Sequence, residues 1–207
     1  MIHRARSLRM SCTARIARVL IGVLSLTTCT ALQVSADDWP QWMGTHRDGV
    51  WRETGIVSSF PAGGPPIRWR IAVGPGYAGP AVADGHVYLM DRQPVLDEEG
   101  NPKAAEDTSL LGSERVLCLN ESSGKLIWEH EYDCPYKISY PTGPRTTPLI
   151  EDERLYTLGA MGDVKCLNAE NGKVIWSVSL LDRFDTKPPV WGYACHPIID
   201  GDKLFLM

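Results

Sequence analysis

Two short stretches of the chain contain the side chains best suited to bind or transform a ligand. The first, GPRTTP, carries Arg145 and Thr146, and the second, WGYACHP, carries Trp191, Tyr193 and His196. A guanidinium can hold a carboxylate or a phosphate, an imidazole can act as a base or a ligand, and aromatic rings can stack on a flat group. A structural ion pair at Arg145 and a structural imidazole at His196 are the alternative interpretations.

A metal ion is the next chemistry to consider, because residues 91–114 are rich in carboxylates. The acids are Asp91, Asp97, Glu98, Glu99, Glu106, Asp107 and Glu114. Their spacing lacks the regular DxDxDG pattern of a calcium loop, which favours a solvated, charged loop. The cysteines show no CxxC spacing either. The sequence therefore predicts no metal site.

The elements that position these candidates belong to an internal repeat. Residues 118–128 read CLNESSGKLIW and residues 166–176 read CLNAENGKVIW, which agree at seven of eleven positions. The longer unit spans 143–180, and parts of it return at 76–92 and 192–207. Each unit contains four short β-rich runs separated by turn signals, in the middle copy PLIED, RLYTL, DVKCLN and KVIWSV. Four strands per repeat predict an all-β fold, a β-propeller of four-stranded antiparallel blades.

The repeated eleven-residue segment is interpreted as a structural motif and not as a catalytic or ligand-binding one. Its tryptophans, Trp128 and Trp176, and the similar Trp69 are expected to pack between neighbouring blades. Gly124 and Gly172 are expected in the turns between the third and fourth strands. The repeated Cys118 and Cys166 are expected to be small buried thiols.

The pattern LNxxxGKxxW resembles the repeat of the pyrroloquinoline quinone (PQQ) family, the quinoprotein alcohol dehydrogenase-like propellers. Leu119, Asn120, Gly124, Lys125 and Trp128 match it, as do their counterparts in the second copy, with Asn where the family more often has Asp. Residues 38–51, DWPQWMGTHRDGVW, resemble the start of exported members. The resemblance implies a propeller fold. It covers both dehydrogenases that bind PQQ with calcium and non-catalytic scaffolds such as outer-membrane assembly factor B.

The first 36 residues are predicted to be a secretory signal peptide. Five arginines precede the apolar run VLIGVLSL and the small residues Val34-Ser35-Ala36. The apolar run is too short to span a bilayer. Cleavage after Ala36 is favoured over lipidation of Cys29, because Thr28 is a poor residue before a lipidated cysteine. The chain is thus expected to be exported, to the periplasm or outside the cell, without a transmembrane segment after the signal.

The remaining chain divides into an N-terminal lead-in segment, residues 37–66, and an incomplete propeller, residues 67–207. The predicted strands are a lone fourth strand at 67–73, two whole blades, and the first two strands of a third. About two and a half blades are therefore expected, as in the N-terminal part of a longer protein.

Two function classes are compatible with these features. Without the five signal arginines, 16 basic residues stand against 25 acidic ones, a net charge of −9 that argues against a nucleic-acid partner. The favoured function is a binding or scaffold module for a protein, peptide or small molecule. Its site is expected on the face that collects the long loops 91–114, 132–146 and 180–195. There Arg145, Thr146, Trp191, Tyr193 and His196 should converge near the propeller axis.

The alternative is a PQQ-dependent dehydrogenase that oxidises an alcohol or a sugar, with PQQ and calcium as cofactors. The Glu/Asn/Asp calcium ligands and the catalytic Asp of that class are not matched residue by residue, and the catalytic residues are not identified. GxSxG and HExxH motifs are absent from the sequence.

Overall fold

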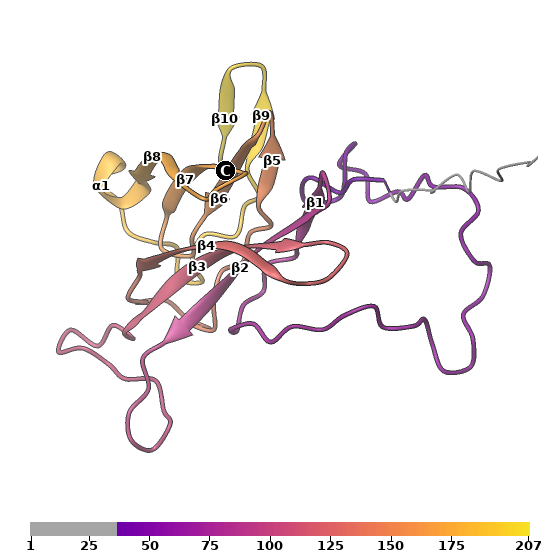
Figure 1. Ribbon diagram of the computed structural model, residues 1–207. Helices are drawn as coiled ribbons and strands as arrows, with labels where there is room; N and C mark the ends of the chain where they lie inside the picture. Colours follow the sequence, from indigo (N-terminus) through magenta and orange to yellow (C-terminus); the bar gives the residue numbers. More distant parts are fainter. Residues whose placement is uncertain (1–36) are drawn as a thin grey trace, which may run out of the picture. The chain divides into compact units, whose positions relative to one another are not determined.

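The computed structural model describes residues 37–207, so the predicted signal peptide and Cys29 lie outside the described residues. Nearly all the regular secondary structure of the described part is β, arranged as two four-stranded antiparallel sheets and one two-stranded sheet (Figure 1). This confirms the predicted fold class of four-stranded blades. None of the helices within residues 37–207 has the length and hydrophobicity required to cross a membrane.

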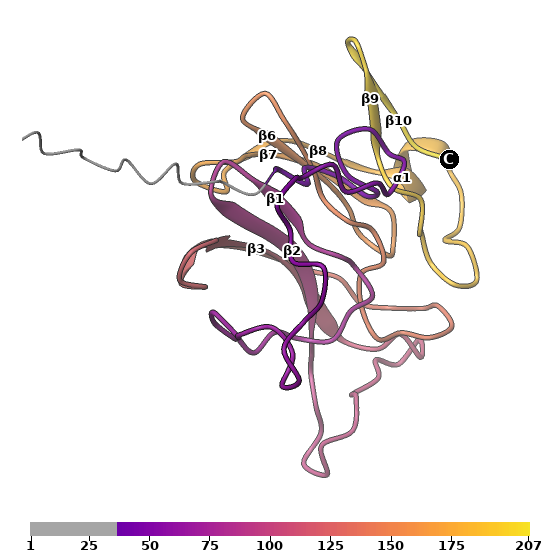
Figure 2. The ribbon, with the colours of Figure 1, turned by 90° about the vertical axis from the view of Figure 1, so that its right-hand side faces the viewer.

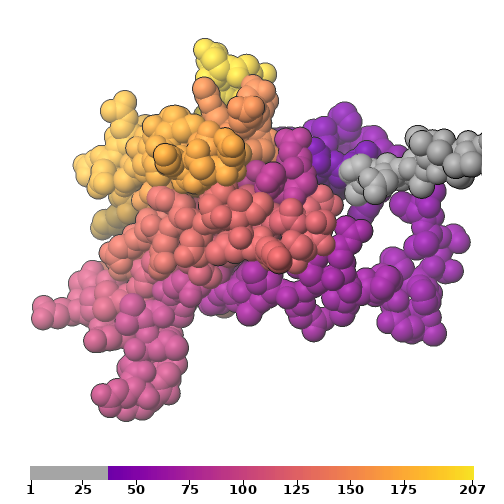
Figure 3. Space-filling view, in the orientation of Figure 1, coloured from indigo at the N-terminus to yellow at the C-terminus, as the bar shows by residue number. Residues whose placement is uncertain are grey.

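The first blade has the strand order β1-β2-β3-β4. Its strands are β1 (Ala81–Ala83), β2 (His86–Pro94), β3 (Gly112–Asn120) and β4 (Leu126–Asp133). The β1–β2 turn is Asp84-Gly85, and both residues have positive φ, 51° and 74°, as a tight hairpin turn requires. A long loop, residues 95–111, joins β2 to β3 and projects from the sheet (Figures 1 and 3).

The second blade repeats this plan with the order β5-β6-β7-β8. Its strands are β5 (Leu149–Glu151), β6 (Arg154–Leu158), β7 (Asp163–Asn168) and β8 (Val174–Ser179). In the β7–β8 turn the Asn168 side chain accepts a hydrogen bond from the Asn171 amide at 3.1 Å, as its position after the strand predicts. The register shift after Cys118 in β3–β4 recurs after Cys166 in β7–β8, so even the irregularities of the blade are repeated.

A third sheet begins after β8. The short helix α1 (Leu180–Phe184) leads into a loop, and then β9 (Ile198–Asp200) and β10 (Lys203–Phe205) form an antiparallel hairpin. Figure 2 shows this hairpin standing beside the second blade. Its register copies that of β5–β6, with Ile198 paired to Phe205 as Leu149 is paired to Tyr156.

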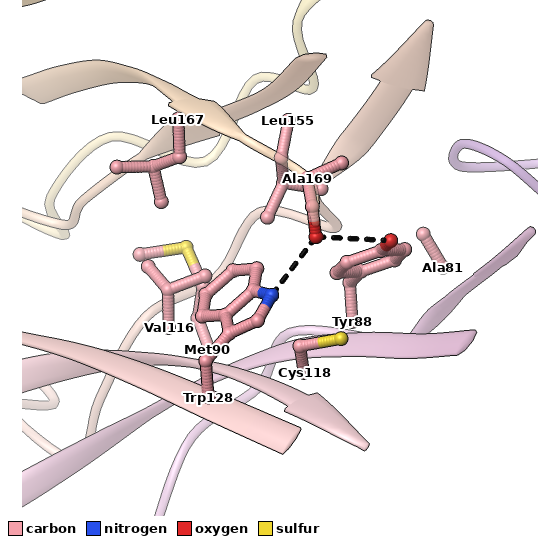
Figure 4. Close-up of a cluster of buried hydrophobic side chains, with 9 residues drawn as sticks. All are labelled: Ala81, Tyr88, Met90, Val116, Cys118, Trp128, Leu155, Leu167 and Ala169. Atoms are coloured by element: carbon pink, nitrogen blue, oxygen red, sulfur yellow. Dashed lines mark hydrogen bonds between the residues drawn. The ribbon is translucent and has the colours of Figure 1, made fainter. Parts of the chain in front are cut away.

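The two blades are joined by a core built around Trp128. The side chain is 9% exposed, and its indole N–H donates to the Ala169 carbonyl at 2.8 Å (Figure 4). The ring lies against Gly172, where a Cβ would come within 2.5 Å of it. Trp69 makes the same contact one blade earlier, donating to the Glu121 carbonyl at 2.6 Å and covering Gly124. Trp128 therefore stacks the first blade on the second, and Trp69 makes the equivalent contact with the first blade, as expected for these two positions.

One expectation of strand structure is wrong: residues 67–73 form no strand, although Trp69 still reaches its turn. The packing of Trp176 between blades stays a prediction. Its side chain is 37% exposed, because no turn equivalent to the one that contains Gly172 faces it within the described residues.

Residues 37–49 run along the inner edges of the strands. Trp39 forms an antiparallel bridge with Val82 of β1, and the Pro40 carbonyl accepts from the Ile150 amide of β5 at 2.9 Å. Arg47 donates to the Pro197 carbonyl just before β9 at 3.0 Å. The lead-in segment therefore ties all three sheets together at their innermost strands.

Candidate binding face

The long loops gather on one face of the molecule and enclose a groove of about 970 Å³. Three segments line it: residues 107–110 between β2 and β3, residues 135–139 after β4, and residues 181–190 after β8. Met161, from the loop between β6 and β7, adds to the floor. The opposite face has only the short turns that join β1 to β2, β3 to β4 and their counterparts.

The groove combines an apolar floor with a charged rim. Leu110, Ile138 and Val190 contribute apolar surface, and the Val190 side chain is 69% exposed. At the rim Lys137 forms an exposed ion pair with Asp107 at 3.4 Å. Lys187 lies in the same lining. Grooves that bind ligands typically have this composition, mostly apolar with a few polar groups.

Backbone contacts hold the groove walls in place. Leu110 and Tyr136 exchange two backbone hydrogen bonds, and the Ser139 amide donates to the Val190 carbonyl at 2.7 Å. Asp107 accepts from both the amide and the hydroxyl of Ser109, which closes the tip of the first loop. Loops fixed in this way form a site with little ordering cost on binding.

An aromatic surface adjoins the groove. Tyr140 and Trp191 directly follow the paired Ser139 and Val190, and their ring centroids lie 5.4 Å apart. Both side chains are 64% exposed, and Tyr140 has a left-handed backbone with φ of 53°. A non-glycine residue in this region is uncommon. The sequence pointed to Trp191, but not to Tyr140.

Arg145 and Thr146 lie close to this surface and are engaged by the chain itself. The Arg145 guanidinium donates to the carbonyls of Gly143, Ser139 and Tyr140 and lies 5.4 Å from the centre of the Tyr77 ring. Thr146 is fully buried and donates to the Leu158 carbonyl at 2.5 Å. Arg145 is therefore partly exposed on the binding face, and Thr146 is not.

His196 lies between Thr147 and Trp42. Its Nδ1 accepts the Thr147 amide at 3.0 Å, and its ring stacks on Trp42 with centroids 4.5 Å apart. Burial, and secondarily the positive charge of Arg47, lower the pKa of His196. Tyr193 is half-buried against Gly162 and donates its amide to the Ala160 carbonyl. The structure therefore places His196 beside Thr147. Trp191 lies beside Tyr140, whose carbonyl accepts from Arg145.

A buried polar cluster beneath the groove was not anticipated from the sequence. Glu114 is fully buried and accepts hydrogen bonds from the Tyr132 and Tyr136 hydroxyls and from the Ala160 amide at 2.9 Å. Burial raises the pKa of the Glu114 carboxyl, against the opposing effect of these donors. Because Ala160 belongs to the second blade, this carboxylate links the blades directly beneath the binding face.

A buried arginine and a buried acid complete that support. Arg92 is 1% exposed, lies 3.6 Å from the centre of the Tyr136 ring and donates to the carbonyls of Cys134 and Leu110. Asp91 is 1% exposed and forms an ion pair with Arg115 at 2.7 Å. Two acids of the stretch 91–114 are therefore structural, which an acid-rich composition alone does not reveal.

The thiols of the blade core are free and buried, as expected for Cys118 and Cys166. Burial raises the pKa of the Cys118 thiol to about 11 and also raises that of Cys134. Thiols with raised pKa values stay protonated and unreactive at neutral pH. These cysteines therefore act as small core residues.

The residues proposed for PQQ fit that cofactor poorly. Three backbone carbonyls accept from the Arg145 guanidinium, and His196 has Nδ1 occupied and its ring covered by Trp42. Within residues 37–207 no three His, Cys, Asp or Glu side chains are grouped as metal ligands. We therefore derive no chemical step through PQQ or calcium.

The chain is similar to several known proteins. The family model described as outer membrane protein assembly factor BamB matches residues 112–207. The outer membrane protein assembly factor BamB of Salmonella typhimurium (strain LT2) is 25% identical over 123 residues, which is 54% of this chain and 27% of that protein. A europium-containing methanol dehydrogenase aligns at a TM-score of 0.40 and 13% identity, over 64% of this chain and 20% of its own.

The stacked blades and their tryptophan contacts define consecutive units of a β-propeller. The match over residues 112–207 shows that this part of the chain is similar to the repeat of that family. The chain spans about a quarter of the length of the curated relative that it matches.

Proposed function

We propose that the chain is an exported binding module that captures an extended polypeptide segment in the groove between its long loops. The observation that carries this proposal is the convergence of three separate loops on one groove, while the opposite face has only short turns. Rigid scaffolds commonly carry binding on such loops. The relative named as an outer membrane protein assembly factor supports export and a protein ligand.

The shape and chemistry of the groove favour a polypeptide. Its length across three loops suits several residues of an extended chain, and its floor of Leu110, Ile138, Met161 and Val190 suits apolar side chains. Lys187 at the rim offers a charge to a carboxylate of the ligand. The adjoining rings of Tyr140 and Trp191 extend the surface, and Arg145 contributes to this edge of the site. Thr146, Tyr193 and His196 support the loops from below.

The test is selection from a displayed peptide library against the protein, followed by affinity measurements on substituted proteins. Val190→Asp and Met161→Asp place charges on the apolar floor, and each should weaken the selected peptides at least tenfold. Ser122→Asp, on the opposite face, is the matched control and should leave affinity unchanged. Peptides that bind equally to the groove variants would contradict the proposal.

The dehydrogenase alternative is separated by a second measurement. Calorimetric titration with PQQ and calcium, followed by an assay of dye-linked alcohol oxidation, tests for cofactor binding and turnover. Saturable binding with oxidation would replace the binding-module proposal by an enzyme.

A further inference from the structure

A second cavity, of about 540 Å³, lies beside the lead-in segment. Most of its lining comes from residues 37–53, and Val82 of β1 and Glu121 of the β3–β4 turn complete it. It shares no lining residue with the groove between the long loops. Cavities that bind small molecules measure roughly 300–1,000 Å³. The stretch DWPQWMGTHRDGVW, residues 38–51, therefore contributes to a candidate site of its own.

Two tryptophan rings in the lining lie next to each other. The ring centroids of Trp39 and Trp51 are 6.4 Å apart, and the ring planes are inclined at 43°. Trp39 is held in place, because its backbone pairs with Val82 and its ring rests on Gly44, where a Cβ would come within 2.8 Å. Trp51 is 63% exposed, so most of its ring is accessible. Indole faces attract cations more strongly than the faces of other aromatic side chains.

The charged side chains around the cavity are mainly acidic. The acids in its lining are Asp37, Asp38, Glu53 and Glu121. Glu53 also accepts the Asp37 amide at 2.5 Å, which joins the two ends of the segment 37–53. The guanidinium of Arg52 donates to both carboxylate oxygens of Asp48, at 3.0 and 2.5 Å, so its charge is already paired. His46, also in the lining, is formally neutral at pH 7. The charges of the cavity therefore favour a cationic ligand.

The arrangement of these carboxylates distinguishes between kinds of cation. Within residues 37–207 no three His, Cys, Asp or Glu side chains are grouped as metal ligands. Calcium and magnesium require such converging oxygens. A quaternary ammonium group does not, because its charge is spread over methyl groups that lie against aromatic faces. Two inclined indoles with dispersed acids around them suit this kind of cation.

We propose that this cavity binds a quaternary ammonium group, carried by a small solute or by a lipid head group. Trp39 and Trp51 contact the methyl groups, and the acids of the lining attract the positive charge without coordinating it. The site is independent of the proposed peptide groove, because the two have no lining residue in common.

The test compares choline, which carries a trimethylammonium group, with its uncharged isostere dimethylbutanol, in which a carbon atom replaces the nitrogen. Each is titrated into the ¹⁵N-labelled exported protein at fixed ionic strength, and the indole N–H signals are followed by NMR. The Trp39 and Trp51 signals are assigned from their loss in Trp39→Phe and Trp51→Phe. We expect both signals to shift saturably with choline, and the isostere to bind about tenfold more weakly because it lacks the charge.

Substitutions separate the contributions of the ring and of the charge. Trp51→Ala should weaken choline binding about tenfold, and its urea midpoint should stay close to that of the parent, because the side chain is mostly exposed. Glu121→Gln should weaken binding about threefold, and less at high salt. The matched controls are Phe60→Ala, an equally exposed ring in the lead-in segment, and Glu98→Gln, in the loop between β2 and β3. Both should leave the affinity for choline unchanged.

Three results would overturn the proposal: equal binding of choline and its isostere, unchanged affinity in Trp51→Ala, or shifts confined to indoles outside the cavity. Calcium chloride that shifts the same signals at lower concentrations than choline would assign the cavity to a metal ion instead. Cosedimentation with phosphatidylcholine vesicles that choline prevents would identify a lipid head group as the source of the ammonium group, and choline binding without cosedimentation would identify a soluble ligand.

Discussion

Replacing Trp128 by Ala tests the contact that stacks the blades. The side chain is 9% exposed and packs on Leu155, Leu167 and Ala169 of the second blade. Truncating a buried aromatic side chain to Ala costs about 3–5 kcal/mol. The Ala169 carbonyl also loses its 2.8 Å hydrogen bond, which adds about 1 kcal/mol. We therefore expect the free energy of unfolding to fall by about 4–6 kcal/mol.

Trp176→Ala is the matched control, because the same residue type occupies the same repeat position. Its ring is 37% exposed, so we expect a loss of about 1–2 kcal/mol. Urea unfolding followed by far-ultraviolet circular dichroism measures both variants. With a slope near 2 kcal/mol/M, the Trp128 variant should unfold about 2–3 M earlier than the parent. Equal losses in the two variants, or a loss at Trp128 below about 1.5 kcal/mol, would refute the reasoning.

Three further predictions concern buried groups. Glu114→Ala should lower the free energy of unfolding by about 3 kcal/mol in urea melts, because the Tyr132 and Tyr136 hydroxyls and an amide lose their acceptor. The raised pKa of Glu114 means that its folded form holds the proton more tightly; stability should therefore fall as pH rises above 4.5, and Glu114→Gln should remove that part of the slope. Burial, and then Lys165, lower the pKa of His130, so stability should fall as pH drops below 6.5 and the unfolded chain takes up the proton first; a pH series of melts that is unchanged by His130→Gln would contradict this.

The local elements were predictable because short-range patterns determine them. The strands RLYTL and DVKCLN begin and end where alternation and turn residues placed them, and Asn168 caps its turn as expected. Asp152-Glu153 lacks glycine yet takes two positive φ angles, 48° and 61°, because the flanking strands demand the same tight turn as Asp84-Gly85.

The long-range contacts were not predictable from single residues. Nothing in the sequence around Glu114 shows that it is fully buried, since its partners Tyr132, Tyr136 and Ala160 come from other elements. Trp42 stacks on His196 only because two segments far apart in the chain pack together. A stretch of sequence shows which groups are able to do chemistry, but the packing of distant segments decides which of them remain free.

The path of the lead-in segment has a consequence for how the protein forms. Trp39 pairs with β1, but Arg47 contacts Pro197, 150 positions later in the chain. During synthesis from the N-terminus, residues 37–49 appear before all the strands and contact Pro197 only when that residue has emerged. Contacts of such large sequence separation form slowly. Until then the inner strand edges and the ring of Trp42 stay open to proteases and to chaperones, so the innermost layer of the described residues closes late.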